Sequence, residues 1–231
     1  MKDETLDYIY RFLQIINQPK TLERELINGG WYPIRLIGRV EKDKSESIDH
    51  FMERVLCGRF YIQIKHNYCY EQYPERKHIL EEAFKLFEEE RYFSCIPLFL
   101  SQIDGISKDF GVKGMFQGKN EKEIGGNHKK EEFSFFSYVI KHTENNSLIK
   151  SNVLKFLYSP LYLSRGASNL TSINTNTNHI NPDQTSYLNR HAILHGYLEF
   201  INYGSRINAL KVINLLIFVI NMIADLDDIE N

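Results

Sequence analysis

The sequence predicts an all-α fold, and three features of the chain lead to that prediction. Apolar residues recur at helical spacing in successive segments of the 231 residues. Capping residues, glycines and prolines stand between those segments, where helices would begin or end. Only the short stretch at residues 29–34, Gly-Gly-Trp-Tyr-Pro-Ile, indicates a turn followed by an irregular or extended segment. We therefore expect one domain over residues 1–231, with sequence-adjacent helices packed antiparallel in a bundle.

Helical spacing predicts six helices in the first two thirds of the chain. Their ranges are Leu6–Ile16, Ser47–Ile64, a charged helix that starts at Pro74, Tyr92–Ile106, Phe133–His142 and Ser147–Tyr158. The expected buried faces are Phe51, Val55, Leu56 and Ile62 in the second helix, and Ile79, Ala83, Leu86 and Phe87 in the third. Gly105 and Gly111 would mark the end region of the fourth helix.

Three stretches do not fit a simple helical bundle. Residues 114–132 combine many Lys and Glu residues with a Gly-Gly pair, which indicates a mobile surface insertion. Residues 166–186 are rich in Asn, Thr and Ser and predict a second, long loop insertion; long ordered loops are often functional. Residues 1–70 form an N-terminal extension whose role the sequence does not explain.

Two more helices are predicted at the carboxyl end. The first would be capped near residue 183 or 185 and would run to Tyr203, where Gly204 would stop it. Ser205 would cap the second, which would run to about Ala224. Its apolar stretch, Val212–Leu226, is interrupted by two Asn and one Asp and is shorter than the ~20 residues that span a bilayer. It therefore predicts a buried core helix rather than a membrane span.

Charge and cysteine content set expectations about location. The formal net charge of −2 gives no global attraction to nucleic acid, so an RNA contact would need a local patch or cleft. Three widely spaced cysteines without a CxxC pair favour reduced thiols. The chain begins Met-Lys-Asp-Glu and lacks the apolar segment of a signal peptide. We expect a cytoplasmic protein without a membrane partner.

The run Asn189–Tyr197, Asn-Arg-His-Ala-Ile-Leu-His-Gly-Tyr, is the strongest candidate for a functional site. Arg190 is a permanent cation whose planar set of donors suits a phosphate. His195 belongs to the one residue type whose ordinary pKa allows proton transfer near neutrality. Together they form a minimal set for cleaving a phosphodiester without a metal or cofactor. Gly196 would let a backbone approach closely. Both residues could instead be ordinary surface residues of a helix, and that reading stays open.

The segment Arg190–His195 resembles the R-polar-x3-H signature of the HEPN superfamily, whose polar residue is usually Asn, Asp or His. With Tyr197 it is also similar to the R-x4-H-x-Y version in HEPN toxins of toxin–antitoxin pairs. The stretch Asn189–Gly196 is typical of larger HEPN-like proteins associated with abortive infection. HEPN domains are α-helical bundles, usually dimeric, and many are metal-independent endoribonucleases. The resemblance implies a bundle of HEPN type with long loop insertions.

The same resemblance implies an endoribonuclease of toxin–antitoxin or anti-phage defence that uses the 2′-hydroxyl of RNA for transesterification. His195 would act as general base or acid, and Arg190 would neutralise charge at the phosphate. Asn189 and His191 would orient substrate or partner groups, and Tyr197 would be modified or contact substrate. The expected partners are RNA, a second copy of the chain, and a regulatory protein such as an antitoxin.

Helix geometry bears on how the two residues could meet. On an ideal helix, Arg190 and His195 lie about 140° apart, so one regular helix does not bring them together. Either Arg190 sits at the helix start, or its side chain crosses a cleft formed with a second copy, as in HEPN dimers. The predicted homodimer follows from the second arrangement.

Other polar residues leave alternatives open. Asp104, beside Gln102 on an otherwise apolar helix, could orient the catalytic histidine or hold Arg190, or only bond to nearby backbone. His191 and His195 could share a metal ion, but no third ligand stands at a diagnostic spacing, so none is expected. A non-catalytic HEPN-like module for dimerisation or partner binding, and a plain helical scaffold, are the competing interpretations.

Overall fold

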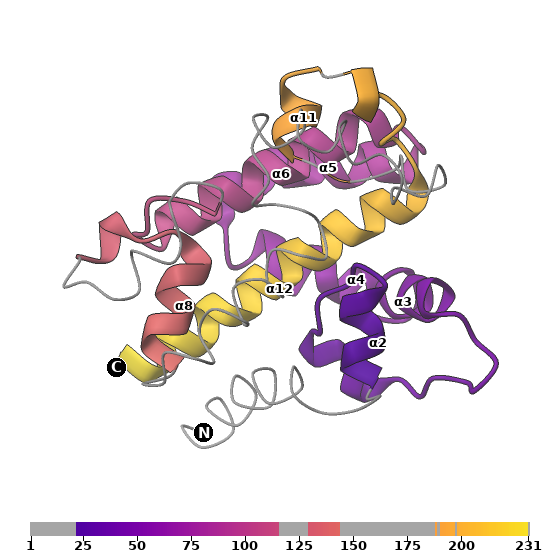
Figure 1. Cartoon of the computed structure of the whole chain (residues 1–231), viewed down its shortest axis with the longest axis horizontal. Helices are drawn as coiled ribbons and strands as arrows, with labels where there is room; N and C mark the ends of the chain where they lie inside the picture. The colour runs from indigo at the N-terminus through magenta and orange to yellow at the C-terminus, as the bar shows by residue number, and fades with distance from the viewer. Residues whose placement is uncertain (1–21, 116–128, 144–187, 189, 197, 231) are drawn as a thin grey trace, which may run out of the picture.

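The computed structural model, drawn in Figure 1, describes residues 22–115, 129–143, 188, 190–196 and 198–230. These residues form helices, turns and loops, with no β-strand among them, so the predicted all-α class is confirmed for this part of the chain. Three predicted elements lie outside the described residues: the helices Leu6–Ile16 and Ser147–Tyr158, and the loop at residues 166–186.

Helix α12 (Arg206–Glu230) crosses the middle of the molecule and packs most extensively against α6 (Tyr92–Asp109). Helix α6 also pairs with α5 (Lys77–Glu88), and a tight turn joins the two into an antiparallel hairpin. Glu90 takes the left-handed conformation in this turn, at φ 58°. The N–H of Arg91 then donates back to the end of α5 at 2.8 Å. Antiparallel packing of sequence neighbours is thus confirmed for this pair.

Helix α12 begins where the sequence predicts and runs farther. The hydroxyl of Ser205 accepts the N–H of Asn208 at 3.2 Å, which satisfies one of the free donors at the helix start. The helix ends at Glu230, beyond the predicted Ala224. Its span Arg206–Asp227 is long and apolar enough to cross a membrane, but 83% of its most apolar window is buried inside the protein. This burial matches the core helix that the sequence predicts.

The described part of the N-terminal extension belongs to the same core. It contains α2 (Leu22–Asn28), the short 3-10 helix η1 (Arg35–Arg39) and α3 (Ile48–Cys57), which lie together at the lower right of Figure 1. Between α2 and η1, the segment Trp31–Ile34 is non-helical, as predicted, and all of it is buried.

A polar residue of α12 binds this segment by its backbone. Asn214, which is fully buried, accepts the N–H of Tyr32 at its Oδ1 atom (2.7 Å). Its Nδ2 atom donates to the carbonyl of Tyr32 at 2.9 Å. One turn farther along α12, the ring of Phe218 stacks on the Tyr32 ring, with centroids 4.9 Å apart. Asn214 therefore replaces the partners that a neighbouring strand would give to Tyr32.

The next polar residues of α12 extend this attachment. The Oδ1 atom of Asn221 accepts the N–H of Arg35 at 3.4 Å, and the guanidinium of Arg35 pairs with the buried carboxylate of Asp225. The residues that interrupt the apolar run of α12 therefore attach the N-terminal segment to the core. This finding gives part of the previously unexplained extension a structural role.

The predicted helix Ser47–Ile64 is wrong in its second half. Helix α3 ends at Gly58, which leaves the helical conformation (φ −83°, ψ −141°), and glycine fits there because a Cβ atom would lie 2.3 Å from a backbone oxygen of the helix. The chain continues as α4 (Tyr61–Gln63) and as a π-helix, η2 (Ile64–Tyr70). This break changes which side faces the core, and Ile62, predicted to be buried, is 63% exposed. The other three predicted core residues are buried: Phe51, Val55 and Leu56.

The charged helix predicted from Pro74 begins as a 3-10 turn, η3 (Pro74–Arg76), and continues as α5. Its predicted buried residues are Ala83, Leu86 and Phe87, which are buried, and Ile79, which is only partly so. Gly111, at φ 96°, does follow the end of α6, whereas Gly105 lies inside that helix. The helix ends at Asp109, three residues beyond the predicted Ile106, so Gly105 lies four residues before its end.

The insertion predicted at residues 114–132 is held at both ends. Gly114 is buried and forms an isolated parallel bridge with Ser134. The 3-10 helix η4 (Lys130–Glu132) leads into α8 (Phe135–Thr143), and the first N–H of α8 donates to the carbonyl of Gly114 at 3.0 Å. The ends of the predicted surface insertion are therefore tied together by backbone hydrogen bonds. The part between them lies outside the described residues.

Candidate functional site

The first part of the predicted motif, Arg190–Leu194, forms α11, a short helix that packs on α6 near the top of Figure 1. Arg190 is the first residue of this helix, which is one of the two placements that the sequence left open. Ile193 is 8% exposed and attaches the helix to the core. His195 follows the helix directly and is exposed. The motif therefore stands at the surface on a buried apolar anchor.

Gly196 ends this helix, so the predicted continuous helix to Tyr203 is wrong. Its φ of 68° is left-handed, and its N–H donates to the carbonyl of Ile193 at 3.2 Å. A Cβ atom at Gly196 would meet nothing within 4 Å. No described atom lies close to Gly196, so the expected close approach of a backbone stays a prediction, and the left-handed conformation of Gly196 is the role that the structure shows.

The two candidate catalytic residues differ in exposure and in their place relative to the helix. The side chain of Arg190 is partly buried, and its Nε atom is closed to solvent. The imidazole of His195 is on an exposed residue. On an ideal helix, residues at this spacing would lie about 7.5 Å apart along the axis and about 140° apart around it, but α11 ends at Leu194, before His195. Helix geometry within one copy therefore does not by itself place the guanidinium beside the imidazole.

The supporting residues of the motif cannot be placed in the same way. Asn189 and Tyr197 lie outside the described residues, and so does the side chain of His191. Their assigned roles stay predictions.

Asp104 has partners at the carboxyl end of α6. Its Oδ2 atom accepts from the ammonium of Lys108 at 2.6 Å, and its Oδ1 atom accepts the N–H of Met115 at 3.0 Å. A Cβ atom on Gly114 would lie 2.7 Å from the same Oδ1 atom, so the backbone passes close to this carboxylate. Asp104 thus fastens the start of the insertion to α6. These contacts match the reading of a polar residue bonded to nearby backbone, and they support no role for it in catalysis.

A polar cluster that the sequence did not reveal surrounds the other polar residue of α6. Gln102 accepts from the guanidinium of Arg76 at 3.2 Å, and Arg76 also makes two hydrogen bonds to Asp109, at 2.6 and 2.9 Å. A Cβ atom at Gly105 would lie 2.3 Å from that guanidinium. Gly105 therefore gives the guanidinium room against α6. Only the interior glycine could have signalled this arrangement in the sequence.

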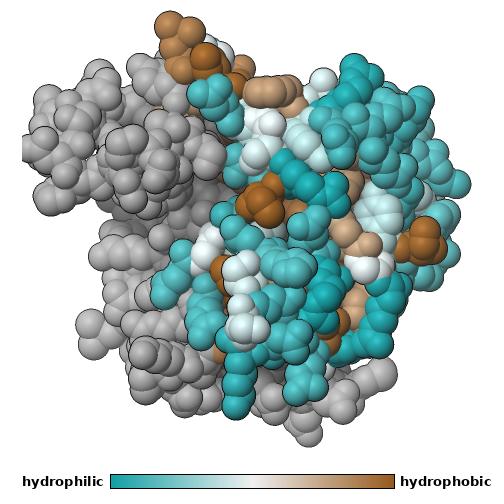
Figure 2. Space-filling view, turned by 90° about the vertical axis from the view of Figure 1, so that its right-hand side faces the viewer, coloured by the Kyte–Doolittle hydropathy of each residue, from teal (hydrophilic) through white to brown (hydrophobic). Residues whose placement is uncertain are grey.

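Exposed apolar residues lie next to the motif. They are Leu194 at 45%, Leu198 at 78% and Ile201 at 53% exposure, and Leu198 begins a 3-10 helix, η8 (Leu198–Phe200). Figure 2 shows hydrophobic side chains at the top of this face, at the height where α11 and η8 lie in Figure 1. Exposed apolar groups that gather near one another are typical of protein interaction surfaces.

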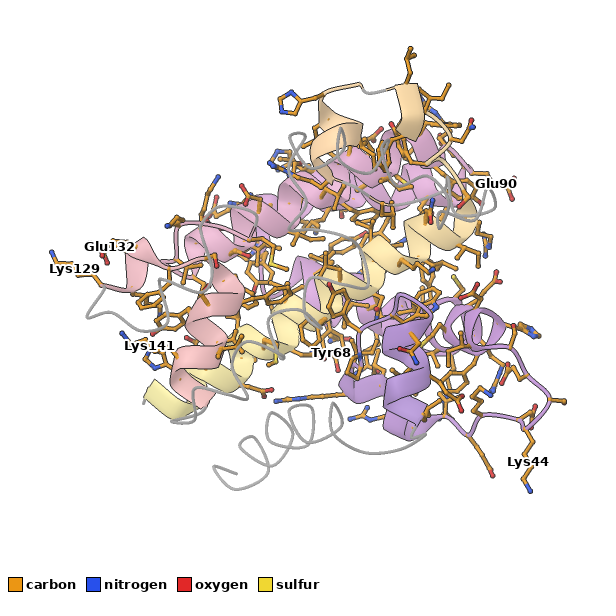
Figure 3. The ribbon with its side chains drawn as sticks, viewed as in Figure 1. Lys44, Tyr68, Glu90, Lys129, Glu132 and Lys141 are labelled. Atoms are coloured by element: carbon orange, nitrogen blue, oxygen red, sulfur yellow. The ribbon has the colours of Figure 1, made fainter. Side chains whose placement is uncertain are left out.

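The charged residues around η4 and α8 are separate from the motif. Figure 3 shows Lys129, Glu132 and Lys141 at the left end of the molecule, whereas α11 lies at its top. Lys141 contacts an aromatic ring, with its Nζ atom 4.6 Å from the Phe133 centroid. These lysines therefore do not extend the motif into a single basic groove.

Metal-binding and thiol groups do not converge on the motif in the described residues. Among these residues, no group of three His, Cys, Asp or Glu side chains is placed to hold a metal ion. All three cysteines are free thiols. Burial raises the pKa of Cys57 to about 11 and that of Cys95 to about 12. Thiols with raised pKa values are poor nucleophiles at neutral pH.

No protein-family model, curated protein or solved structure matches the chain.

Proposed function

We propose that the protein is a metal-independent endoribonuclease of HEPN type that acts in toxin–antitoxin or abortive-infection defence. One observation carries the proposal: the R-polar-x3-H run forms a short surface helix, anchored by Ile193, with Arg190 at its start and His195 exposed after its end. An exposed imidazole suits a polymeric substrate, because RNA must reach it from solvent.

The proposed reaction is transesterification at a ribose. His195 takes the proton of the 2′-hydroxyl, whose oxygen attacks the neighbouring phosphorus, and the P–O5′ bond breaks. A histidine in the same site returns a proton to the leaving 5′-oxygen, which leaves a 2′,3′-cyclic phosphate. Arg190 stabilises the added negative charge on the phosphoryl oxygens. Unpaired RNA is the preferred substrate, since its backbone can bend into line.

We also propose that two copies of the chain form the site. The exposed side chains of Leu194, Leu198 and Ile201 beside the motif support this arrangement. Covering these side chains with the same surface of a second copy would bury apolar area and bring two motifs together.

Cleavage assays with matched variants test the catalytic assignment. Total RNA is incubated with the protein in EDTA, beside Arg190→Ala, His195→Ala and His191→Asn. The exposed His78 on α5 supplies the control variant, His78→Ala. We expect both motif alanine variants to lose cleavage with melting temperatures near wild type, and His191→Asn to be milder. Cleavage of a substrate with a 2′-deoxy scissile nucleotide, or loss of cleavage in EDTA, would contradict the mechanism.

Mixing two inactive variants tests the shared site. A dimer of one Arg190→Ala copy and one His195→Ala copy keeps one arginine and one histidine, so the mixture should regain part of the activity. Leu198→Asp should give a monomer by light scattering and abolish cleavage. If wild type is monomeric at micromolar concentration, or the mixture stays inactive, the two-copy site is wrong.

A non-catalytic partner-binding module is the second candidate. The exposed apolar residues beside α11 favour it, because the same surface could bind a different protein. This candidate predicts that His195→Ala changes neither RNA integrity nor toxicity in cells, whereas Leu198→Asp removes partner binding.

A further inference from the structure

The segment that leads from η8 into α12 is docked on the start of α6. The ring of Tyr203 packs edge-on against the ring of Phe93, with centroids 5.2 Å apart and planes at 73°. The hydroxyl of Tyr203 donates to the backbone carbonyl of Phe93 at 2.9 Å. This contact joins positions 110 residues apart in the chain. Along the chain, Tyr203 lies between α11, which carries the motif, and α12, the central helix of the fold.

The carbonyl of Phe93 has a specific reason to accept this hydrogen bond. In a regular helix it would accept the N–H of the residue four positions later, and that residue is Pro97. Proline has no N–H, so its place in α6 removes the usual intrahelical donor. The hydroxyl of Tyr203 supplies the donor instead. Burial raises the pKa of Tyr203, so this hydroxyl keeps its proton.

The neighbouring residues of Tyr203 complete the attachment. A Cβ atom at Gly204 would lie 2.5 Å from the Phe93 ring, so glycine lets that ring lie directly on the backbone. On the other side, the carbonyl of Tyr203 accepts from the Nδ2 atom of Asn208 and from the N–H of Ser205, both at 2.9 Å. Tyr203 is thus bound to α6 through its hydroxyl and to α12 through its carbonyl.

We propose that Tyr203 is a positioning residue that fixes the α11–η8 segment, and with it His195, on α6. The regular helix ends at Gly196, so the helix does not carry the position of His195 forward. Among the described contacts, Ile193 attaches the chain to the core before His195, and Tyr203 attaches it to α6 after His195. In its effect on catalysis, this inference rests on the proposed function; the attachment itself can be measured without it.

Hydrogen exchange in three variants tests the attachment. Tyr203→Phe keeps the ring and removes the donor, and it should speed amide exchange in α11 and η8 about fivefold, the scale of one hydrogen bond. Pro97→Ala restores an N–H that competes for the Phe93 carbonyl, so it should loosen the same amides. Amide exchange in α11 and η8 should be no faster in the double variant than in either single variant, because both changes act on the hydrogen bond to the Phe93 carbonyl. The melting temperature of the double variant should exceed that of Tyr203→Phe, since the carbonyl regains a donor.

Tyr61→Phe is the matched control, because it also removes a hydroxyl hydrogen bond, the one to Glu88 at 2.9 Å, but away from this segment. It should leave exchange in α11 and η8 unchanged. In the RNA assay, Tyr203→Phe should lower kcat about fivefold with KM nearly unchanged, because it moves a catalytic group rather than a binding one. Unchanged exchange in α11 and η8 in Tyr203→Phe overturns the inference. A wild-type protein that cleaves no RNA refutes the proposed function alone, and the exchange result still decides the attachment.

Discussion

Removing the side-chain amide of Asn214 should destabilise the protein far more than its small size suggests. The residue is fully buried and satisfies both backbone polar groups of Tyr32, at 2.7 and 2.9 Å. Asn214→Ala removes the hydrogen bonds that the side chain makes to a buried N–H and a buried carbonyl, and a buried polar group that loses its partner costs ~1–3 kcal/mol. We expect a loss of about 4 kcal/mol in the free energy of unfolding. For a chain of this length, that loss corresponds to roughly 8–16 °C in melting temperature.

The single tryptophan of the chain makes this loss measurable at the right place. Trp31 adjoins Tyr32 and is fully buried, so its fluorescence reports on the segment that Asn214 binds. Urea unfolding followed by fluorescence and by circular dichroism should shift together if the segment and the helices unfold as one unit. Asn67→Ala is the control, since that exposed residue bonds only to Glu71 within the described contacts and should change stability by less than ~0.5 kcal/mol. A loss below ~1 kcal/mol for Asn214→Ala would refute the reasoning.

A second substitution at the same position tests the hydrogen-bond geometry. Asn214→Asp keeps an acceptor for the N–H of Tyr32, but a carboxylate oxygen replaces the amide nitrogen that donates to the carbonyl of Tyr32. Burial and that carbonyl should raise the pKa of the new carboxyl in the folded state. Because the folded-state pKa is raised, the variant is destabilised above it. Stability returns as pH falls through that pKa toward the unfolded value, where the protonated group can donate. A penalty that does not shrink on acidification would contradict this geometry.

Three further predictions concern local features. Glu90→Gly should raise the free energy of unfolding by about 0.5–1 kcal/mol, measured by urea unfolding, because Glu90 sits at φ 58° in the outer turn of Figure 3 and glycine takes that conformation without strain. Gly196→Ala should cost about 1 kcal/mol by the same measurement, since φ is 68° and the surrounding space is open. Thiol labelling of Cys57 at mildly alkaline pH should be roughly 100-fold slower in the folded than in the unfolded protein. Its rate should rise with pH toward the folded pKa of about 11, and equal rates would contradict the burial of this thiol.

Local signals in the sequence were sufficient for much of the fold. The cap at Ser205, the amphipathic face of α5 and the irregular segment at residues 29–34 each follow from residues close together in the chain. The break in the helix predicted over residues 47–64 did not, although Gly58 stands there. A single glycine inside a helical pattern is compatible with a continuous helix and with a break. The close approach of a backbone oxygen at Gly58, which leaves no room for a Cβ atom, is visible only in the structure.

Long-range polar pairing could not be predicted. Asn214 and Asn221 read in the sequence only as interruptions of an apolar helix, because their partners lie more than 180 residues away. The same limit applies to Asp104. Its partner Lys108 is local in the chain, but its second partner, the N–H of Met115, depends on how the insertion folds back. Spacing identifies a polar residue on an apolar face, whereas the partner that satisfies it is set by the tertiary fold.

The motif shows both sides of this limit. Its residue types and spacing identified Arg190 and His195 as candidates, but the sequence has a glycine at both 196 and 204, and only the structure shows that the helix ends at the first of them. Because the helix ends there, the position of His195 depends on contacts at each side of it rather than on one rigid rod. Changes at Gly196 and at Tyr203 should therefore alter the same exchange rates in α11 and η8, although the two positions are seven residues apart and only Tyr203 touches α6 among the contacts described. If the helix were continuous through Tyr203, a change at Tyr203 should have little effect on amide exchange near His195. Gly196→Ala should then stabilise the helix, because alanine favours helix more than glycine does.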